Sequence, residues 1–154
     1  MTYRIQGLDP APFAALFELD SRQLEAKGMI RMIVDDPNFP CRVSLRDADI
    51  GDEVILLNHV SHDGDNPYRA SHAIFVSKSA RHPAQYVDAI PPALDRRILS
   101  LRAFDADGMM IDAALVQPSE ADPAIRQLFA NPAADHIDAH NATRGCFAAR
   151  IDRT

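Results

Sequence analysis

Two apolar runs that flank a polar loop constrain the fold more than any other feature of the sequence. They lie in residues 40–76, PCRVSLRDADIGDEVILLNHVSHDGDNPYRASHAIFV. Residues 54–57 are apolar at consecutive positions, which is typical of a strand covered on both faces. Residues 70–76 place Ile74 and Val76 opposite Phe75, which predicts a second strand. We therefore expect a central, covered pair of strands that presents the polar loop at one end.

Further strands are predicted along the second half of the chain. Asp105-Ala106-Asp107-Gly108 separates two alternating runs, residues 98–104 and 109–116, and an Asp-Gly step in that setting is a strong hairpin signal. Residues 135–141 and 145–151 predict two more strands on either side of a short turn. The opening residues 3–8 predict an edge strand, and residues 29–34 are extended and apolar.

Short helices are predicted between these strands. Asp20 and Gln23 have the spacing of a capping box, and Gly28 follows the helix that they begin. A helical turn is expected from Pro12, and Asp122-Pro123 is typical of an N-cap followed by the first helical residue. Six or seven strands with two or three short helices predict an α+β fold. We expect a single domain over residues 1–154 with a mainly antiparallel sheet.

Charge and composition exclude several classes of protein. The chain has 154 residues, a net charge of −6 and a pI near 5.4, so we expect no nucleic-acid partner, which would require a broad basic face. No apolar run approaches the roughly 20 residues of a membrane-spanning helix, and the first residues lack the pattern of a secretion signal. The 2 cysteines cannot form a disulfide framework. We expect a cytoplasmic protein with no membrane partner.

Several stretches of the chain together resemble a known family. They read FPCRVSLRDADIGDEVILLNH, NPYRASHAIFV, LSLRAFDADGMM, LFANP and HNATRGCFAARIDR. On these stretches the chain is similar to an uncharacterised bacterial family, domain of unknown function 1203. The resemblance implies a small stand-alone bacterial protein of about this length. It implies no activity and no site residues, so each candidate residue below rests on the sequence itself.

A first candidate site is a metal centre on the strand at residues 135–141. His136, Asp138 and His140 point to one face of such a strand because side chains alternate. A metal site needs a further ligand, which His59, His62 or His72 can supply if the strands are neighbours. The alternative is a polar strand face that is exposed to solvent.

A second candidate is a nucleophilic thiol at Cys146. His140 lies a few residues away across the predicted hairpin, and an imidazole beside a thiol can generate a thiolate. Asn141 or Asp138 can orient the ring, as in Cys-His-Asn acyl transfer. The alternative is that Cys146 is a small core residue, since cysteine is among the most buried residue types.

A third candidate is a binding site for a small ligand at the polar loop. Loops at strand ends are where rigid sheets present binding groups. The candidate ligand-binding residues are Arg42, Asn58, His59, Tyr68, Arg69, His72 and Arg144. Tyr68 and Arg69 can stack on and clamp an anion, with His59 or His72 titrating near neutrality. The alternative is a solvated turn in which Arg69 pairs with the neighbouring aspartates.

These candidates lead to one principal expectation and two alternatives. We expect a protein that binds a small polar or anionic molecule at a pocket formed by residues 58–72, Arg42 and the turn from His140 to Arg144. The first alternative is a Cys/His or metal-assisted hydrolase. The second is a structural module that self-associates through its acidic middle and basic end, forming a homo-oligomer. No phosphate loop, nucleophile elbow or dinucleotide motif is present, so the sequence identifies no cofactor.

Overall fold

Two antiparallel sheets form the framework of the protein. The computed structural model describes all 154 residues. The strands are β1 (Tyr3–Gln6), β2 (Ile30–Ile33), β3 (Glu53–His62), β4 (Ala70–Ser77), β5 (Gln85–Val87), β6 (Leu99–Phe104), β7 (Met110–Val116), β8 (His136–Asn141) and β9 (Phe147–Arg153). The helices are α1 (Ala11–Ala14), α2 (Ser21–Ala26), α3 (Pro92–Asp95) and α4 (Ala121–Phe129), and a 3₁₀ turn, η1 (Ala15–Glu18), follows α1. None of the helices is long and apolar enough to span a membrane.

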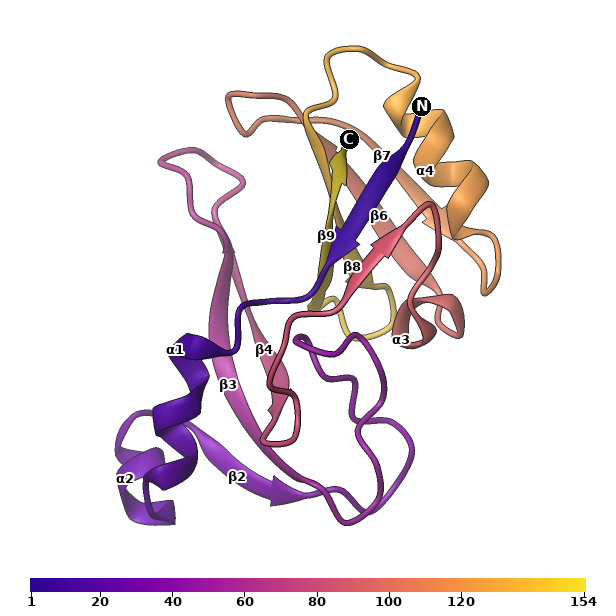
Figure 1. The fold of residues 1–154 in the computed structure, drawn as a ribbon. Helices are drawn as coiled ribbons and strands as arrows, with labels where there is room; N and C mark the ends of the chain where they lie inside the picture. Colours follow the sequence, from indigo (N-terminus) through magenta and orange to yellow (C-terminus); the bar gives the residue numbers. More distant parts are fainter.

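The larger sheet has six strands in the order β5-β1-β9-β8-β6-β7. Helix α4 lies along one side of this sheet, beside β6 and β7 (Figure 1). Its buried residues Ile125, Leu128 and Phe129 belong to the same apolar core as Leu101 and Ile137 of the sheet. Because side chains alternate along a strand, the residues of β8 between these core positions face the other side. That second side carries His136, Asp138 and His140.

The smaller sheet has three strands in the order β2-β3-β4 and has its own apolar core. Leu24 of α2 and Phe17 of η1 pack there with Ile55 and Ile74 of the sheet. Asp20 caps α2 through a complete capping box, as its sequence predicts. This sheet and helices α1 and α2 occupy the lower part of Figure 1, whereas the larger sheet and α4 occupy the upper part.

The two sheets meet where the long β3–β4 hairpin reaches the second side of β8 and β9. Arg150 of β9 donates to Ser61 O of β3 at 3.0 Å, and His62 hydrogen-bonds to Gly108 O in the β6–β7 turn at 2.9 Å. Closer to the middle of the molecule, Arg42 Nε donates to Phe147 O at 2.7 Å. The hairpin therefore covers the polar side of β8, and Asp138 is only 1% exposed although it is charged.

The structure confirms the α+β class and the antiparallel strands, and it corrects several details. The predicted antiparallel sheet of six or seven strands corresponds to the six-stranded sheet, but β2, β3 and β4 pair only with one another and form a second sheet that was not predicted. There are four short α-helices where two or three were predicted. The predicted hairpin around Asp105 to Gly108 is confirmed as β6–β7.

The boundaries of two elements also differ from the prediction. Strand β3 is the middle strand of its sheet, but β4 lies at the edge, so the predicted central pair is half correct. Strand β3 continues to His62 into the expected loop because its last residues still pair with β4. Helix α4 begins at Ala121, with Glu120 rather than Asp122 at the N-cap position. Local capping signals place a helix start only to within a residue or two.

Candidate functional site

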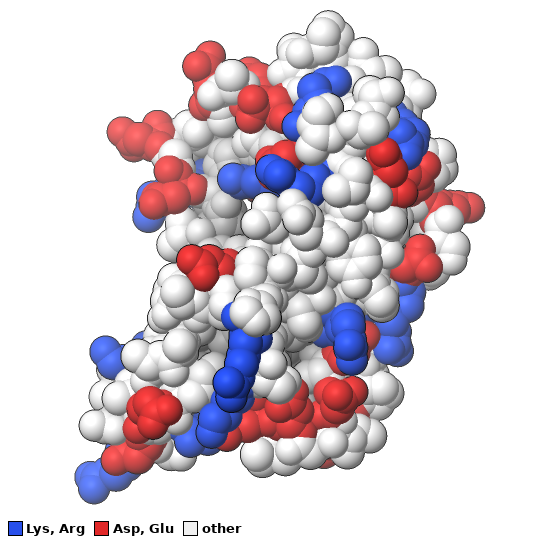
Figure 2. Space-filling model, viewed as in Figure 1, with Lys and Arg blue, Asp and Glu red and all other residues white.

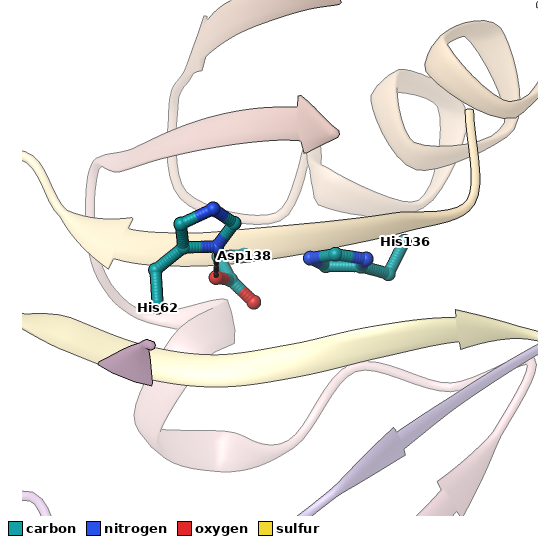
Figure 3. Close-up of side chains that lie close together, drawn as sticks. All are labelled: His62, His136 and Asp138. Carbon is teal, nitrogen blue, oxygen red and sulfur yellow. Dashed lines mark ion pairs between the residues drawn. The ribbon is translucent and has the colours of Figure 1, made fainter. Parts of the chain in front are cut away.

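Three potential metal ligands converge in the space between the two sheets. His62 comes from the end of β3, and His136 and Asp138 come from one face of β8 (Figure 3). One ligand atom from each residue lies within 4.8 Å of the others. The side chains of His62 and Asp138 are 8% and 1% exposed, and that of His136 is 12% exposed. Two imidazoles and a carboxylate thus share one largely buried space.

In the rings of His62 and His136, the outer nitrogen, which faces away from Asp138, forms a hydrogen bond. This bond determines which ring nitrogen carries the proton. His62 Nε2 lies 2.9 Å from Gly108 O, and since a carbonyl oxygen only accepts, Nε2 carries the proton. His136 Nδ1 lies 3.0 Å from Asp135 Oδ2, so the carboxylate favours a proton on Nδ1. The remaining nitrogens, His62 Nδ1 and His136 Nε2, are then lone-pair donors. His136 Nε2 is buried without a hydrogen-bond partner and points toward the other two side chains (Figure 3).

Asp138 is held in place by Arg150. Arg150 Nε donates to Asp138 Oδ1 at 2.8 Å, and its terminal nitrogen donates to Oδ2 at 3.0 Å. This pairing is the main reason that the pKa of Arg150 is raised. Each carboxylate oxygen has two lone pairs, so Oδ2 keeps one that is directed away from Arg150. His62 Nδ1 lies 4.0 Å from that oxygen.

Aromatic rings close one side of the His62–His136–Asp138 cluster. Phe104 of β6 stacks on the ring of His62 at 4.3 Å between centroids and on the ring of His136 at 5.3 Å. Tyr68 contacts the edge of Phe104 at 6.1 Å. An apolar wall of this kind limits access of water and strengthens electrostatic interactions inside the site.

Acidic side chains gather at the hairpin tips near this cluster. Figure 2 shows acidic side chains at the upper left, over the tips of the β3–β4 and β6–β7 hairpins. The tips carry Asp63 and Asp65 on one hairpin and Asp105 and Asp107 on the other. The two hairpins are joined by the hydrogen bond of His62 to Gly108. Negative charge concentrated around a site raises the local concentration of cations.

A second group of histidines lies around His140, two residues after Asp138 on β8. The rings of His140 and His72 are 5.0 Å apart, edge to face, and His140 Nδ1 lies 3.0 Å from Gly145 O. Burial lowers the pKa of His140 to about 4, and it also lowers the pKa values of His72 and His59, with nearby arginines acting in the same direction. At neutral pH these imidazoles are uncharged. By its position His140 is not one of the three converging ligands, and His62 takes that place.

The cysteine candidate has a different neighbour from the one expected. Cys146 Sγ lies 3.1 Å from a terminal nitrogen of Arg42 and 3.5 Å from Asn141 Nδ2. His140 packs against Phe147 at 6.0 Å and hydrogen-bonds to the backbone of Gly145. Asn141, which was predicted to orient the His140 ring, contacts the thiol instead, and the cation that contacts the sulfur is a guanidinium.

The residues that were predicted to bind a small ligand do not form a single group in the structure. Arg42 is 2% exposed, whereas Asn58, Arg69 and Arg144 are on the surface. Arg69 forms an ion pair with Asp63, as the solvated-turn alternative anticipates. The structure brings His59, Tyr68 and His72 toward the larger sheet, where they contact Phe147 of β9, Phe104 of β6 and His140 of β8, respectively. A ligand role for these residues stays a prediction.

The sequence reasoning missed Phe104, Gly108, Asp135 and Arg150, which orient or enclose the cluster. The role of Asp135 could have been predicted from the sequence, because it directly precedes His136 and a carboxylate is a frequent hydrogen-bond partner of a histidine ring. Arg150 is 12 residues from Asp138 and faces it across the β8–β9 hairpin. Phe104 and Gly108 lie far from their partners in the sequence, and no local pattern connects them. Their roles follow only from the strand order β9-β8-β6 and from the β3–β4 hairpin that crosses it.

Fold and site define a small α+β protein with a buried His-His-Asp cluster between two antiparallel sheets. The chain belongs to the protein family of unknown function DUF1203, whose model matches residues 38–153. The matched region contains all three cluster residues and both strands that supply them. No curated protein and no solved structure shows significant similarity to this chain.

Proposed function

We propose that this protein binds a divalent transition-metal ion through His62, His136 and Asp138. The observation that carries the proposal is the arrangement of the two rings, each of which has its outer nitrogen hydrogen-bonded and its inner nitrogen directed at the carboxylate. Metal-binding histidines usually donate their second N–H to a carbonyl or a carboxylate in this way. The buried, unpartnered His136 Nε2 is otherwise costly, because buried polar atoms normally have partners.

The donor set favours zinc or ferrous iron over calcium or magnesium. Two imidazole nitrogens suit borderline transition metals, whereas calcium and magnesium prefer oxygen ligands alone. Bonds of about 2.1 Å to a tetrahedral ion hold its donors about 3.4 Å apart. The donors here lie within 4.8 Å of one another, so small rotations of the side chains bring them into range.

Three protein ligands leave a coordination position open, and this supports a role for a small ligand. An ion with three protein ligands supplies a Lewis acid and a site for water, as in metal-assisted hydrolases. Arg102 of β6 pairs in register with Asp138 and forms no ion pair with a carboxylate, so a free guanidinium lies on the same face as the cluster. We therefore favour a small anionic ligand or substrate at this metal. Nucleophilic catalysis by Cys146 with His140 has less support, because no contact joins the two side chains.

Metal analysis of the purified protein tests the proposal. Protein prepared without a histidine tag is expected to contain about one equivalent of zinc, iron or manganese, or to take up one equivalent of zinc in calorimetric titration. His136→Ala and Asp138→Asn should abolish this binding, and His82→Ala, which changes an exposed histidine outside the cluster, should leave it intact. Wild-type protein that neither contains nor binds these ions would contradict the proposal.

Weakening the hydrogen bond between Asp135 and His136 distinguishes a metal site from a polar cluster that binds no metal. Asp135→Asn leaves all three ligands in place but weakens the acceptor that holds His136 Nδ1. Loss of such an outer partner typically lowers metal affinity about 10- to 100-fold. An unchanged zinc affinity in Asp135→Asn would show that the ring orientation described here does not determine binding.

A further inference from the structure

A groove on the smaller sheet is separate from the metal-ligand cluster. It has a volume of about 490 Å³, within the range of about 300–1,000 Å³ that is typical of small-molecule sites. One wall is the chain from Asp9 to Glu18, which includes α1 and η1, and the other is formed by residues between Val76 and Arg81, at and after the end of β4. None of the three cluster residues lines this groove, so it is a second candidate binding site.

The groove is lined by part of the apolar core of the smaller sheet. Phe17, Val43 and Val76 are buried members of that core, and Phe13 and Ala80 pack against it while they stay partly exposed. This core has 8 buried residues, against 19 in the core of the larger sheet. An apolar group bound in the groove extends the smaller core, and its removal from water favours binding.

Charged side chains of opposite sign line the two walls of the groove. Asp9 and Glu18 belong to the wall that includes α1 and η1, and Lys78 and Arg81 belong to the other. No ion pair crosses the groove, because Lys78 pairs with Glu53 at 3.4 Å and one oxygen of Asp9 accepts from the backbone of α1. The side chains of Glu18 and Arg81 have no polar partner and are exposed. The groove therefore keeps a free carboxylate and a free guanidinium apart.

This charge pattern selects the kind of molecule that fits. A simple anion is repelled by the acidic wall and a simple cation by the basic wall, whereas a molecule with one charge of each sign complements both walls. Its two charges must be far enough apart to reach opposite walls. In a free amino acid both charges are attached to one carbon, but in a peptide each further residue separates them by up to about 3.5 Å. A short peptide with free termini and apolar side chains meets these requirements.

We propose that this groove binds a short apolar peptide with free termini, a dipeptide or a tripeptide. Its ammonium group pairs with Glu18, and its carboxylate accepts from Arg81, whose guanidinium can donate two parallel hydrogen bonds to one carboxylate. Its side chains cover Phe17, Val43 and Val76. Binding forms no covalent bond and is independent of the proposed metal centre.

Titration of the full-length protein with the dipeptide phenylalanyl-leucine tests the proposal, with a chelator present so that metal binding makes no contribution. A Kd of about 1 mM or lower is expected, and the NMR signals of the Val43 and Val76 methyl groups should shift. Acetylation of the amino terminus and amidation of the carboxyl terminus each remove one charge and should each weaken binding about threefold to tenfold. Absence of binding, shifts confined to other residues, or equal affinity for all three compounds would overturn the proposal.

Two surface substitutions provide the matched comparison. Arg81→Ala and Glu18→Ala should each weaken binding of the unmodified dipeptide about threefold to tenfold, and both change exposed side chains, so the fold stays intact. Arg22→Ala and Glu25→Ala, at exposed positions of α2 outside the groove, should leave the affinity unchanged. In Arg81→Ala, amidation of the dipeptide should have no further effect, because both changes remove the same ion pair. An Arg81→Ala protein that distinguishes the two compounds as well as wild type does would show that the proposed pairing is wrong.

Discussion

His140 makes the stability of the fold depend on pH in a direction that the structure determines. The side chain is buried at 2% exposure in contact with His72 and Phe147, and burial lowers its pKa from 6.5 to about 4. In the unfolded chain the imidazole binds its proton near pH 6.5, so the unfolded state holds more protons between pH 6.5 and 4. Stability must therefore fall as the pH falls through this window.

The size of the effect follows from the difference between the two pKa values. That difference is about 2.5, and each pH unit corresponds to about 1.4 kcal/mol, so His140 alone removes about 3 kcal/mol between pH 7.5 and pH 4. Burial lowers the pKa values of His59 and His72 as well, so they act with the same sign. A loss of this size is a large part of the 5–15 kcal/mol that typically stabilises a domain.

Urea denaturation over a series of pH values measures this loss, with a chelator present so that metal binding makes no contribution. His140→Gln should reduce the loss between pH 7.5 and pH 4 by about 3 kcal/mol, and His82→Gln, at an exposed position, should leave it unchanged. Titration of the His140 ring by NMR gives the pKa of the folded state directly. A folded-state pKa at or above 6 would refute the reasoning from burial.

Three further substitutions test the packing that positions the site, each by urea denaturation near neutral pH. Gly7→Ala should destabilise the fold by about 3 kcal/mol or more, because the new Cβ would lie 1.9 Å from Val43 O; a loss below 1 kcal/mol would contradict this close approach. Asp20→Ala should cost about 1 kcal/mol through loss of the capping box, and no change would show that α2 does not depend on it. Arg150→Met should cost about 3–5 kcal/mol because it leaves the buried carboxylate of Asp138 unpaired, and Arg150→Met combined with Asp138→Leu should recover much of that loss.

Local patterns in the sequence predicted the secondary structure well where the signal is short-range. The β6–β7 hairpin depends on its Asp-Gly turn and two alternating runs, and helix α2 depends on Asp20 and Gln23. The division into two sheets was not predictable in this way. It depends on which strand edges pair, and β3 pairs with β2 and β4 instead of with any strand of the larger sheet.

The candidate site shows the same division between local and long-range information. Alternation along β8 placed His136 and Asp138 on one face, and this follows from strand geometry alone. His62 was one of three histidines considered as a further ligand, and only the path of the β3–β4 hairpin selects it. For Cys146 the local expectation was His140, but Arg42, 104 residues away in the sequence, contacts the sulfur.

The sequence by itself determined the α+β class, the antiparallel hairpins and the types of side chain available for chemistry, because these follow from backbone periodicity and turn preferences. The tertiary structure alone decided which of those side chains meet. It placed His62 beside β8, left Arg42 without a carboxylate and buried Asp138 beneath a hairpin. Contacts between distant segments depend on the packing of whole apolar faces, and that information is spread over the chain rather than held in any one motif.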